Sequence, residues 1–166
     1  MGDVFDGDRG ADLSVLRSLG VVSLPAVDRV TAAGVVPIDA ATGKMIAVTV
    51  NRGIDFPGGH RHERDASVEA VARRECMEEA GAELGQLEVI DVVESTFFGT
   101  TPEAITYVVV FAGAVEAMDE FRLSHEVHAR EWLFPSAFLS RYDSGDPTLI
   151  ERWLRLSFEA ISVPWR

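Results

Sequence analysis

The sequence is poor in the residues that form disulfides, cysteine metal clusters and basic surfaces. Cys76 is the only cysteine among 166 residues, which excludes an intrachain disulfide and a metal cluster built from cysteines. Lys44 is the only lysine, and 15 basic residues against 27 acidic ones give a formal net charge of −12. A chain this acidic repels long nucleic acids unless its basic residues cluster, and the sequence contains no such cluster. We therefore expect no long nucleic acid as a partner. The single cysteine is most consistent with a reducing, cytoplasmic setting.

Long apolar runs are also missing. A membrane-spanning helix needs roughly 20 consecutive apolar residues, so we expect no membrane partner. Residues 1–24 are acidic and lack the apolar centre of a secretory signal. We expect them to form a leader with a short helix near Asp12–Leu19 that ends at Gly20. Residues 25–166 have the length of a single domain. The sequence leaves the oligomeric state undecided, and a homodimer is one of the alternatives.

The order of the expected elements indicates the fold class. Strands come first, then one helix over Ser67–Ala80, then strands and two terminal helices. The expected strands are Arg29–Pro37, Lys44–Val50, Leu87–Phe98, Ile105–Ala114 and Glu131–Phe134, and the expected terminal helices are Ser136–Tyr142 and Thr148–Ile161. The alternation is too irregular for a doubly wound parallel sheet. We predict an α/β fold of the α+β kind: a mixed β-sheet sandwich with the Ser67–Ala80 helix between sheets.

The Ser67–Ala80 helix has glutamates on its apolar side. At about 100° per residue, one stripe is apolar and consists of Val68, Val71 and Ala72. Glu75 and Glu79 continue this stripe, Glu78 lies at its edge, and Met77 lies on the opposite face. The i, i+3, i+4 spacing makes the three carboxylates neighbours. Gly81 directly after the helix is a typical C-terminal cap.

Clustered carboxylates on the inward side of a helix repel one another strongly in a low-dielectric environment. A hard divalent cation removes that repulsion, and Mg²⁺ or Mn²⁺ prefers oxygen ligands. The competing interpretation is that these are solvated surface glutamates, which are common because glutamate is a good helix former. Their position on the apolar stripe argues for the cation. The turn Phe56–Gly59 contains two glycines, which allow the backbone to approach a ligand closely.

These residues resemble a known family motif. Gly59 followed by the run Arg74–Ala82 (RECMEEAGA) is similar to the Nudix box, written G-x5-E-x7-R-E-U-x-E-E-x-G-U with U a bulky apolar residue. The second half, R-E-x-x-E-E-x-G, is intact, and the resemblance covers about residues 28–142. It implies a Nudix-type fold and a pyrophosphohydrolase acting on acid anhydrides.

The first half of the motif departs from the pattern. Counting forward from Gly59 places Asp65 where the first glutamate belongs, whereas counting back from Arg74 places Ala66 there. One residue is therefore inserted, most easily in the loop His60–Ala66. The family's first glutamate is absent in either count, and Asp65 is the residue that can partly replace it.

The resemblance also implies roles for individual residues. Glu75 and Glu79 would be the principal ligands of Mg²⁺ (or Mn²⁺), and the Gly58 carbonyl would add another oxygen. Glu78 would be a further ligand or act through bound water in catalysis. Arg74 would orient the glutamates by charge-assisted hydrogen bonds. The implied reaction is attack of water on a phosphorus within a diphosphate.

Two further candidates lie outside the motif. Glu126, in the polar loop Ser124–Arg130, is the candidate general base, although a solvated loop glutamate is an equally good interpretation. Arg52 is the candidate for binding a substrate phosphate through its guanidinium group.

The expected substrate is a small nucleotide: a nucleoside diphosphate linked to another moiety. The alternative function is a degenerate Nudix domain that binds a nucleotide or a protein partner without turning it over. Subtypes of the family are often marked by a proline or a tyrosine after the box, and the corresponding stretch, Phe97–Thr100, matches neither mark.

Overall fold

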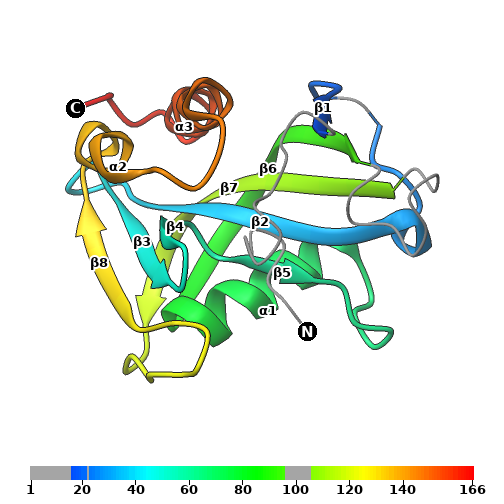
Figure 1. Ribbon diagram of the computed structural model, residues 1–166, viewed down its shortest axis with the longest axis horizontal. Helices are drawn as coiled ribbons and strands as arrows, with labels where there is room; N and C mark the ends of the chain where they lie inside the picture. The colour runs from blue at the N-terminus through cyan, green and yellow to red at the C-terminus, as the bar shows by residue number, and fades with distance from the viewer. Residues whose placement is uncertain (1–15, 22, 96–105) are drawn as a thin grey trace.

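The computed structural model describes residues 16–21, 23–95 and 106–166. Figure 1 shows their arrangement. In chain order the elements are β1 (Leu16–Ser18), a 3-10 helix (Val27–Arg29), β2 (Val30–Asp39), β3 (Lys44–Val50), β4 (Gly53–Asp55), β5 (Gly58–His60), α1 (Val68–Ala80), β6 (Ala82–Ser95), β7 (Thr106–Met118), β8 (Ala129–Leu133), α2 (Pro135–Arg141) and α3 (Pro147–Ala160). In this described part, no helix has the length and apolar character needed to cross a membrane.

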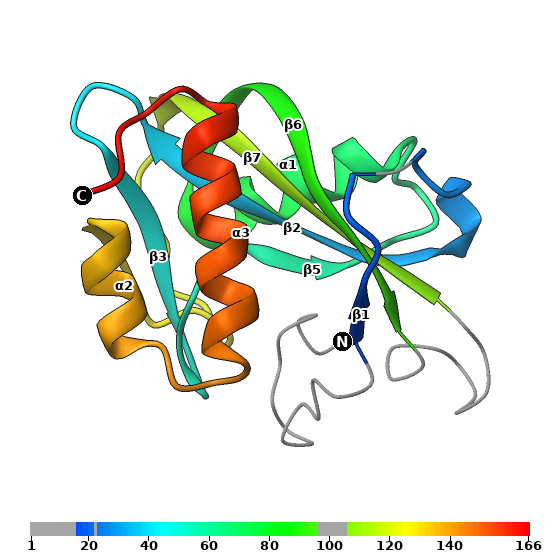
Figure 2. The ribbon, with the colours of Figure 1, turned by 90° about the horizontal axis from the view of Figure 1, so that it is seen from above.

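The strands form one mixed sheet. Its order is β1-β6-β7-β2-β3-β4, with β5 also paired to β2 and β8 to β3. The pairing of β2 with β7 is parallel, and the other pairings are antiparallel. Figures 1 and 2 show α2 and α3 on one side of the sheet and α1 on the other. The predicted α+β class is confirmed, with the layers joined into one hydrogen-bonded sheet that has helices on both sides.

The central strand β2 is apolar because both of its faces are covered. Ala32 and Val36 belong to the core beneath α2 and α3, whereas Ala33 and Val35 belong to the core beneath α1. Side chains of a strand alternate between the two faces of a sheet, so a strand with a helix layer on either side reads as a continuous apolar run. The two cores together hold α1 against the sheet and so determine where its glutamates lie.

Most expected elements are confirmed with shifted ends, but the leader prediction is wrong where it can be compared. Residues Leu16–Ser18 form strand β1, whereas the sequence pattern predicted a helix near Asp12–Leu19. Residues 12–15 lie outside the described part. The reason is tertiary: Leu16 pairs with Ser95 and Ser18 with Val93, so this segment extends the sheet at the edge of β6. Pairing with an exposed strand edge overrides a weak local helix preference.

Two glycine-containing turns are also more regular than expected. Short strands begin at Gly53 and at Gly58, forming β4 and β5. The expected strand Leu87–Phe98 begins earlier, at Ala82, and its last residues lie outside the described part, as does Phe97–Thr100. The short strand β5 pairs with β2 through Gly58 and Gly34. This pairing places the glycine turn directly over α1.

A buried carboxyl group joins the terminal helix to the sheet and to the leader. Asp91 on β6 is fully buried, and its Oδ2 accepts a hydrogen bond of 2.8 Å from Trp153 Nε1 on α3. Its Oδ1 accepts a hydrogen bond of 2.8 Å from the backbone N–H of Gly20. A buried acceptor is stable only when its partners are present. Asp91 therefore links three segments that are distant in the sequence.

We expect Trp153→Phe to lower the free energy of unfolding by at least about 1–3 kcal/mol, because it removes a donor from a buried acceptor and leaves space in the core. Urea unfolding followed by circular dichroism measures this difference. The matched control is Trp132→Phe, because Trp132 is an exposed tryptophan on β8. Equal stability of the two variants would contradict the assignment of Asp91 as a link between the segments.

Candidate active site

Helix α1 begins and ends as the sequence predicts. Ser67 is its N-cap, and its side-chain oxygen accepts a hydrogen bond of 3.0 Å from the N–H of Ala70. Gly81 follows with the left-handed φ of 63°, and its N–H donates to the carbonyl oxygen of Met77 at 3.0 Å. A side-chain cap satisfies an otherwise unpaired donor of the first turn, and glycine adopts the left-handed conformation with little strain. The ends of the helix are therefore determined locally.

The predicted stripe is confirmed. All three of its apolar members are buried, namely Val68, Val71 and Ala72. Glu75 and Glu79 are buried with them, at 8% and 4% exposure, whereas Glu78 is exposed. Two carboxylates of one helix face are therefore removed from most of the solvent. Burial of this kind needs compensating partners.

The glycine turn supplies one set of partners. The N–H of Gly58 donates a hydrogen bond of 3.0 Å to Glu79 Oε2. At Gly59 the backbone comes so close to the helix that an added Cβ would lie 2.5 Å from both carboxylate oxygens of Glu75. Only glycine permits this approach. The Gly58–Gly59 backbone and the two buried carboxylates thus form one compact group of oxygen and N–H groups.

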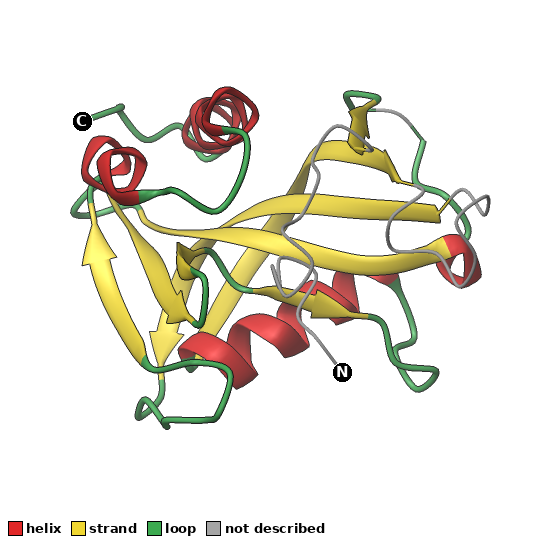
Figure 3. Ribbon diagram, in the orientation of Figure 1, coloured by secondary structure: helices red, strands yellow, loops and turns green. Residues whose placement is uncertain are grey.

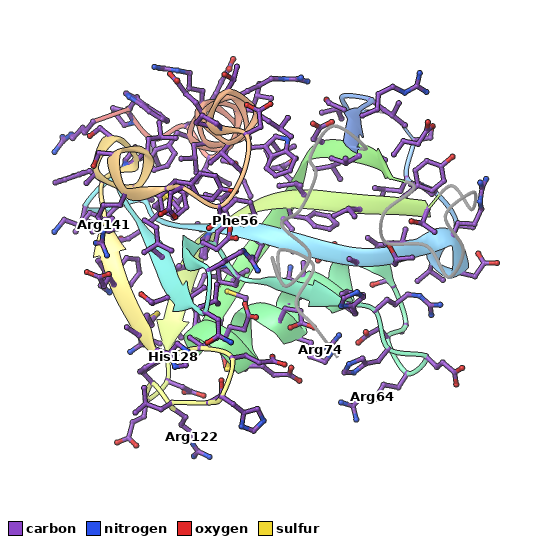
Figure 4. All side chains as sticks on the ribbon, in the orientation of Figure 1. Phe56, Arg64, Arg74, Arg122, His128 and Arg141 are labelled. Atoms are coloured by element: carbon purple, nitrogen blue, oxygen red, sulfur yellow. The ribbon has the colours of Figure 1, made fainter. Side chains whose placement is uncertain are left out.

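Arg74 supplies the second set of partners. Its Nε and Nη2 donate to the two oxygens of Asp65 at 3.0 and 2.9 Å. Its Nη1 donates to Glu75 Oε1 at 2.6 Å and to Glu78 Oε2 at 3.2 Å. Nη2 also donates to the carbonyl oxygen of His60 at 2.9 Å. One guanidinium group therefore binds three carboxylates and the loop that precedes the helix. Figure 4 labels Arg74 among the side chains.

The structure decides between the two candidates for the position of the missing first glutamate. Asp65 is buried and makes the two-point ion pair with Arg74, whereas Ala66 is exposed. The N–H of His62 donates a further hydrogen bond of 2.7 Å to Asp65 Oδ2. The hydrogen bonds from Arg74 hold the pKa of Asp65 below its usual value, with a smaller opposing effect of burial. Asp65 therefore occupies the place of that glutamate at the usual spacing from Gly59, and the extra residue lies between Asp65 and Arg74.

The charges near Glu75 reveal the neighbourhood of Glu126. Burial raises the pKa of Glu75, Arg74 lowers it, and the negative charges of Glu78 and Glu126 raise it further. Glu126 lies in the exposed loop between β7 and β8, where its N–H donates to Ser124 Oγ at 3.2 Å. The charge of Glu126 thus acts on Glu75, and its role as a general base stays a prediction.

The donor set is suited to a hard cation, although the carboxylates are turned to other partners. Within residues 16–21, 23–95 and 106–166, no three acidic, histidine or cysteine side chains are already arranged around one point as metal ligands. Glu75 binds Arg74, and Glu79 binds the Gly58 N–H. Clustered carboxylate oxygens beside a backbone that lacks a Cβ nevertheless match the chemistry that Mg²⁺ or Mn²⁺ prefers. Glu75, Glu78 and Glu79 are the residues able to hold such an ion.

Arg52 makes an ion pair with a residue of β4. Its Nη2 donates to Asp55 Oδ2 at 2.6 Å, and the Asp55 side chain is fully buried. Burial raises the pKa of Asp55 to about 6, although the charge of Arg52 opposes the shift. A role for Arg52 in binding a substrate phosphate stays a prediction. It would use guanidinium N–H groups other than the Nη2 donor that binds Asp55.

Comparison with known proteins decides the family. A family model described as the NUDIX domain matches residues 28–153. The chain belongs to the Nudix family. Residues 59–82 carry the Nudix box motif, with Arg74–Gly81 as its intact second half, and α1 is called the box helix from here on. No curated protein sequence matches the chain.

Solved structures with the Nudix fold agree with this assignment. The pyrophosphohydrolase BsRppH of Bacillus subtilis, solved as a mutant, superposes with a TM-score of 0.65 at 19% identity, covering 89% of each chain. The Ap4A hydrolase of C. elegans, solved as a binary complex, gives a TM-score of 0.56 at 21% identity over 79% of this chain and 97% of that one. The NUDIX domain of Shewanella oneidensis NrtR, complexed with ADP ribose, gives 0.61 at 15% identity over 80% and 89%. At these identities the likeness shows the fold.

Arg130 contacts the end of the box helix, and no sequence pattern singles it out. Its Nη1 donates to the carbonyl oxygen of Ala80, the last residue of the Nudix box helix, at 2.5 Å. Arg130 is 50 residues away from Ala80 in the sequence. A basic residue near a helix end stabilises the last carbonyl groups, but this signal is only visible when the residue is nearby in the chain. Tertiary structure alone reveals the contact.

Asp65→Asn tests whether Asp65 supports the box. At pH 7 we expect it to lower the free energy of unfolding by about 1–3 kcal/mol, because a partly buried charged hydrogen-bond pair is lost. The pKa of Asp65 is lower in the folded protein than its ordinary 3.8, so its contribution is present above that value and is lost as pH falls through the folded-state pKa. The difference from the parent protein should therefore shrink below about pH 4. Urea unfolding at several pH values measures it.

The control for this prediction is Glu63→Gln, because Glu63 is an exposed residue of the same loop. A stability difference for Asp65→Asn that does not change with pH, or that equals the effect of Glu63→Gln, would contradict the ion-pair assignment.

Proposed function

We propose that this Nudix-type hydrolase uses a divalent cation, Mg²⁺ or Mn²⁺, to cleave a diphosphate bond in a nucleoside diphosphate linked to another group. One observation supports it most: Glu75 and Glu79 are buried side by side on the box helix, next to the Gly58–Gly59 backbone. Two buried carboxylates so placed gain little for stability alone, because their repulsion opposes folding. They are useful where a cation joins them to a phosphate.

Each residue of the box has a distinct role in this proposal. Glu75, Glu78 and Glu79 hold the cation, and the Gly58 carbonyl adds a neutral oxygen. The bound cation neutralises charge on the non-bridging phosphate oxygens. Arg74 orients Glu75 and Glu78 through the charged hydrogen bonds described above. Glu126 accepts the proton of the attacking water, since it is exposed and lies within electrostatic reach of Glu75.

The substrate class follows from the chemistry of the site and from the ligands of similar proteins. One structural neighbour is an Ap4A hydrolase and another was solved with ADP ribose. Both compounds contain a nucleoside whose phosphates are linked to a second group. A screen of nucleotide sugars, dinucleoside polyphosphates, nucleoside triphosphates, ADP-ribose, NADH and CoA with Mg²⁺ or Mn²⁺ identifies the preferred member.

The alternative, a Nudix domain that binds without catalysis, is less well supported. Its main argument was the missing first glutamate of the box. Asp65 makes the ion pair with Arg74 in that place, so the box keeps its internal charge balance. Release of phosphate or of a nucleoside monophosphate in the screen distinguishes the two functions.

Glu79→Gln should lower kcat by on the order of 10²–10³, because it removes an anionic oxygen that a hard cation needs while keeping the size of the side chain. Steady-state kinetics on the best substrate of the screen measures it. The control is Glu69→Gln on the same helix, since Glu69 makes only a solvent-exposed pair with Arg73. Equal activity of the parent protein and Glu79→Gln would rule out the assignment of Glu79 as a metal ligand.

Millimolar Mg²⁺ or Mn²⁺ should raise the melting temperature relative to EDTA, because an ion that binds only the folded state stabilises it. The gain is about 2.7 kcal/mol at a concentration 100 times Kd. Differential scanning fluorimetry at matched ionic strength measures the shift. Glu79→Gln should show a smaller shift than the parent protein. A parent melting temperature that the cation does not change would argue strongly against the metal site.

A further inference from the structure

The loop of residues 119–128 connects β7 with β8 and carries the proposed base, Glu126. Figure 3 shows it as an irregular segment beneath the box helix. A cavity of about 500 Å³ separates the loop from that helix, with Glu78 and Gly81 on the helix side and Asp119, Glu120 and Arg122 on the loop side. Within the loop, hydrogen bonds join Ser124 to Glu126 and to Val127, so this turn has a defined local shape. Its position relative to the helix depends on attachments at the ends of the loop.

Arg130 makes the attachment at the C-terminal end of the box helix. Its Nη1 donates to the carbonyl oxygen of Ala80 at 2.5 Å and to that of Asp119 at 3.2 Å. A cation near the last turn also interacts favourably with the negative end of the helix dipole. The same guanidinium group lies over the ring of Phe121, 5.3 Å from the ring centre. Arg130 therefore touches the helix end and the beginning of the loop at once.

The backbone around Gly81 completes this attachment. The N–H of Asp119 donates to the carbonyl oxygen of Gly81 at 2.7 Å. An added Cβ on Gly81 would lie 3.1 Å from Arg130 Nη1 and 3.3 Å from the carbonyl oxygen of Asp119. A side chain at this position would crowd Arg130 and Asp119, and it would also have to adopt the left-handed conformation that favours glycine.

The exposed part of the loop lies between two apolar contacts. Phe121 packs against the core beneath the box helix, and Val127 is buried in the same core at 1% exposure. Beyond Val127, the N–H of His128 donates to the carbonyl oxygen of Thr49 at 2.8 Å. Residues 122–126, including Glu126, are exposed between these contacts. Figure 4 shows Arg122 on this loop and Arg74 at another part of the box helix.

We propose that Arg130 is a positioning residue for the reaction: by joining the C-terminal end of the box helix to the loop 119–128, it holds Glu126 beside the box glutamates. This proposal rests on the proposed function, because it assumes that Glu126 is the base. Glu78 on the box helix and Asp119, Glu120 and Arg122 on the loop line one cavity, so the loop and the box glutamates lie close together. A misplaced base transfers a proton poorly, so the effect belongs to the chemical step.

Arg130→Met tests the proposal, because methionine keeps apolar contact with Phe121 but removes the donors and the charge. We expect kcat to fall by roughly 10- to 10²-fold. KM and the Mg²⁺ concentration that gives half of the maximal rate should change little, since Glu75, Glu78 and Glu79 remain. Arg130→Lys keeps a charged donor and should restore part of kcat. A change in KM with an unaltered kcat, or no rescue by lysine, would overturn the proposal.

A double-mutant cycle with Glu126→Gln separates positioning from a general structural effect. Loss of a general base lowers kcat by roughly 10²-fold or more. If Arg130 acts through Glu126, adding Arg130→Met to Glu126→Gln should cause no further loss. Additive losses would overturn the proposal, because independent sites add. An unchanged kcat in Glu126→Gln would overturn it as well, since no base would then need positioning. Loss of activity in Glu79→Gln tests the proposed function separately.

Amide hydrogen exchange provides a measurement that needs no substrate. In Arg130→Met the amides of Asp119 and of residues 122–128 should exchange faster, whereas those within the box helix should keep their protection. Arg155→Met is the matched control, because Arg155 pairs with Glu151 and lies 4.4 Å from the ring centre of Trp165, on α3. It should change neither exchange in the loop nor kcat. Unchanged exchange in the loop, or faster exchange throughout the Arg130→Met protein, would overturn the proposal. If the methionine variant does not fold, Arg130→Lys is measured instead. Because lysine keeps only part of the contacts, we expect a smaller increase of exchange in the same loop.

Discussion

The ion-pair network of Arg74 is the interaction on which the rest of the site depends. Its guanidinium group binds Asp65, Glu75, Glu78 and the carbonyl oxygen of His60. Two unit charges 4 Å apart interact by about 4 kcal/mol at an effective dielectric constant of 20. Fully burying a valine gains only about 1.5–3 kcal/mol. The apolar stripe of the box helix therefore does not easily offset mutual repulsion of its glutamates, and a positive charge among them is required for this helix to pack inward.

Arg74 also explains why the longer loop of this chain is compatible with the motif. The loop before the helix is held at His60 by a hydrogen bond from Arg74 and at Asp65 by the two-point ion pair. Because Asp65 keeps the usual spacing from Gly59, the extra residue lies between Asp65 and Arg74, and the ion pair of these two residues joins the ends of that longer segment. The close approach of Gly59 to Glu75 is present beside this segment.

Two arginines, one within the box helix and one on β8, bind backbone carbonyl groups at the ends of this helix or in the loops beside it. Arg74 binds the preceding loop, whereas Arg130 binds the carbonyl oxygens of Ala80 and Asp119. The planar guanidinium group donates several hydrogen bonds in fixed directions, which a lysine ammonium group does not. With a single lysine in the chain, arginine carries nearly all of the positive charge. Two of these arginines connect the box helix to the loops on either side of it.

Local features determined what the sequence alone could predict. The helical period and Gly81 predicted the box helix and its buried face. The spacing of Glu75, Glu78 and Glu79 predicted that their carboxylates are neighbours, because residues three and four apart lie together on a helix. Tertiary structure decided the rest. The strand at Leu16–Ser18 exists because β6 offers it an edge. The choice of Asp65 over Ala66, and the contact of Arg130 with a helix end 50 residues away, depend on distances between separate segments. No local periodicity encodes such distances, since they arise only when the two cores bring the segments together.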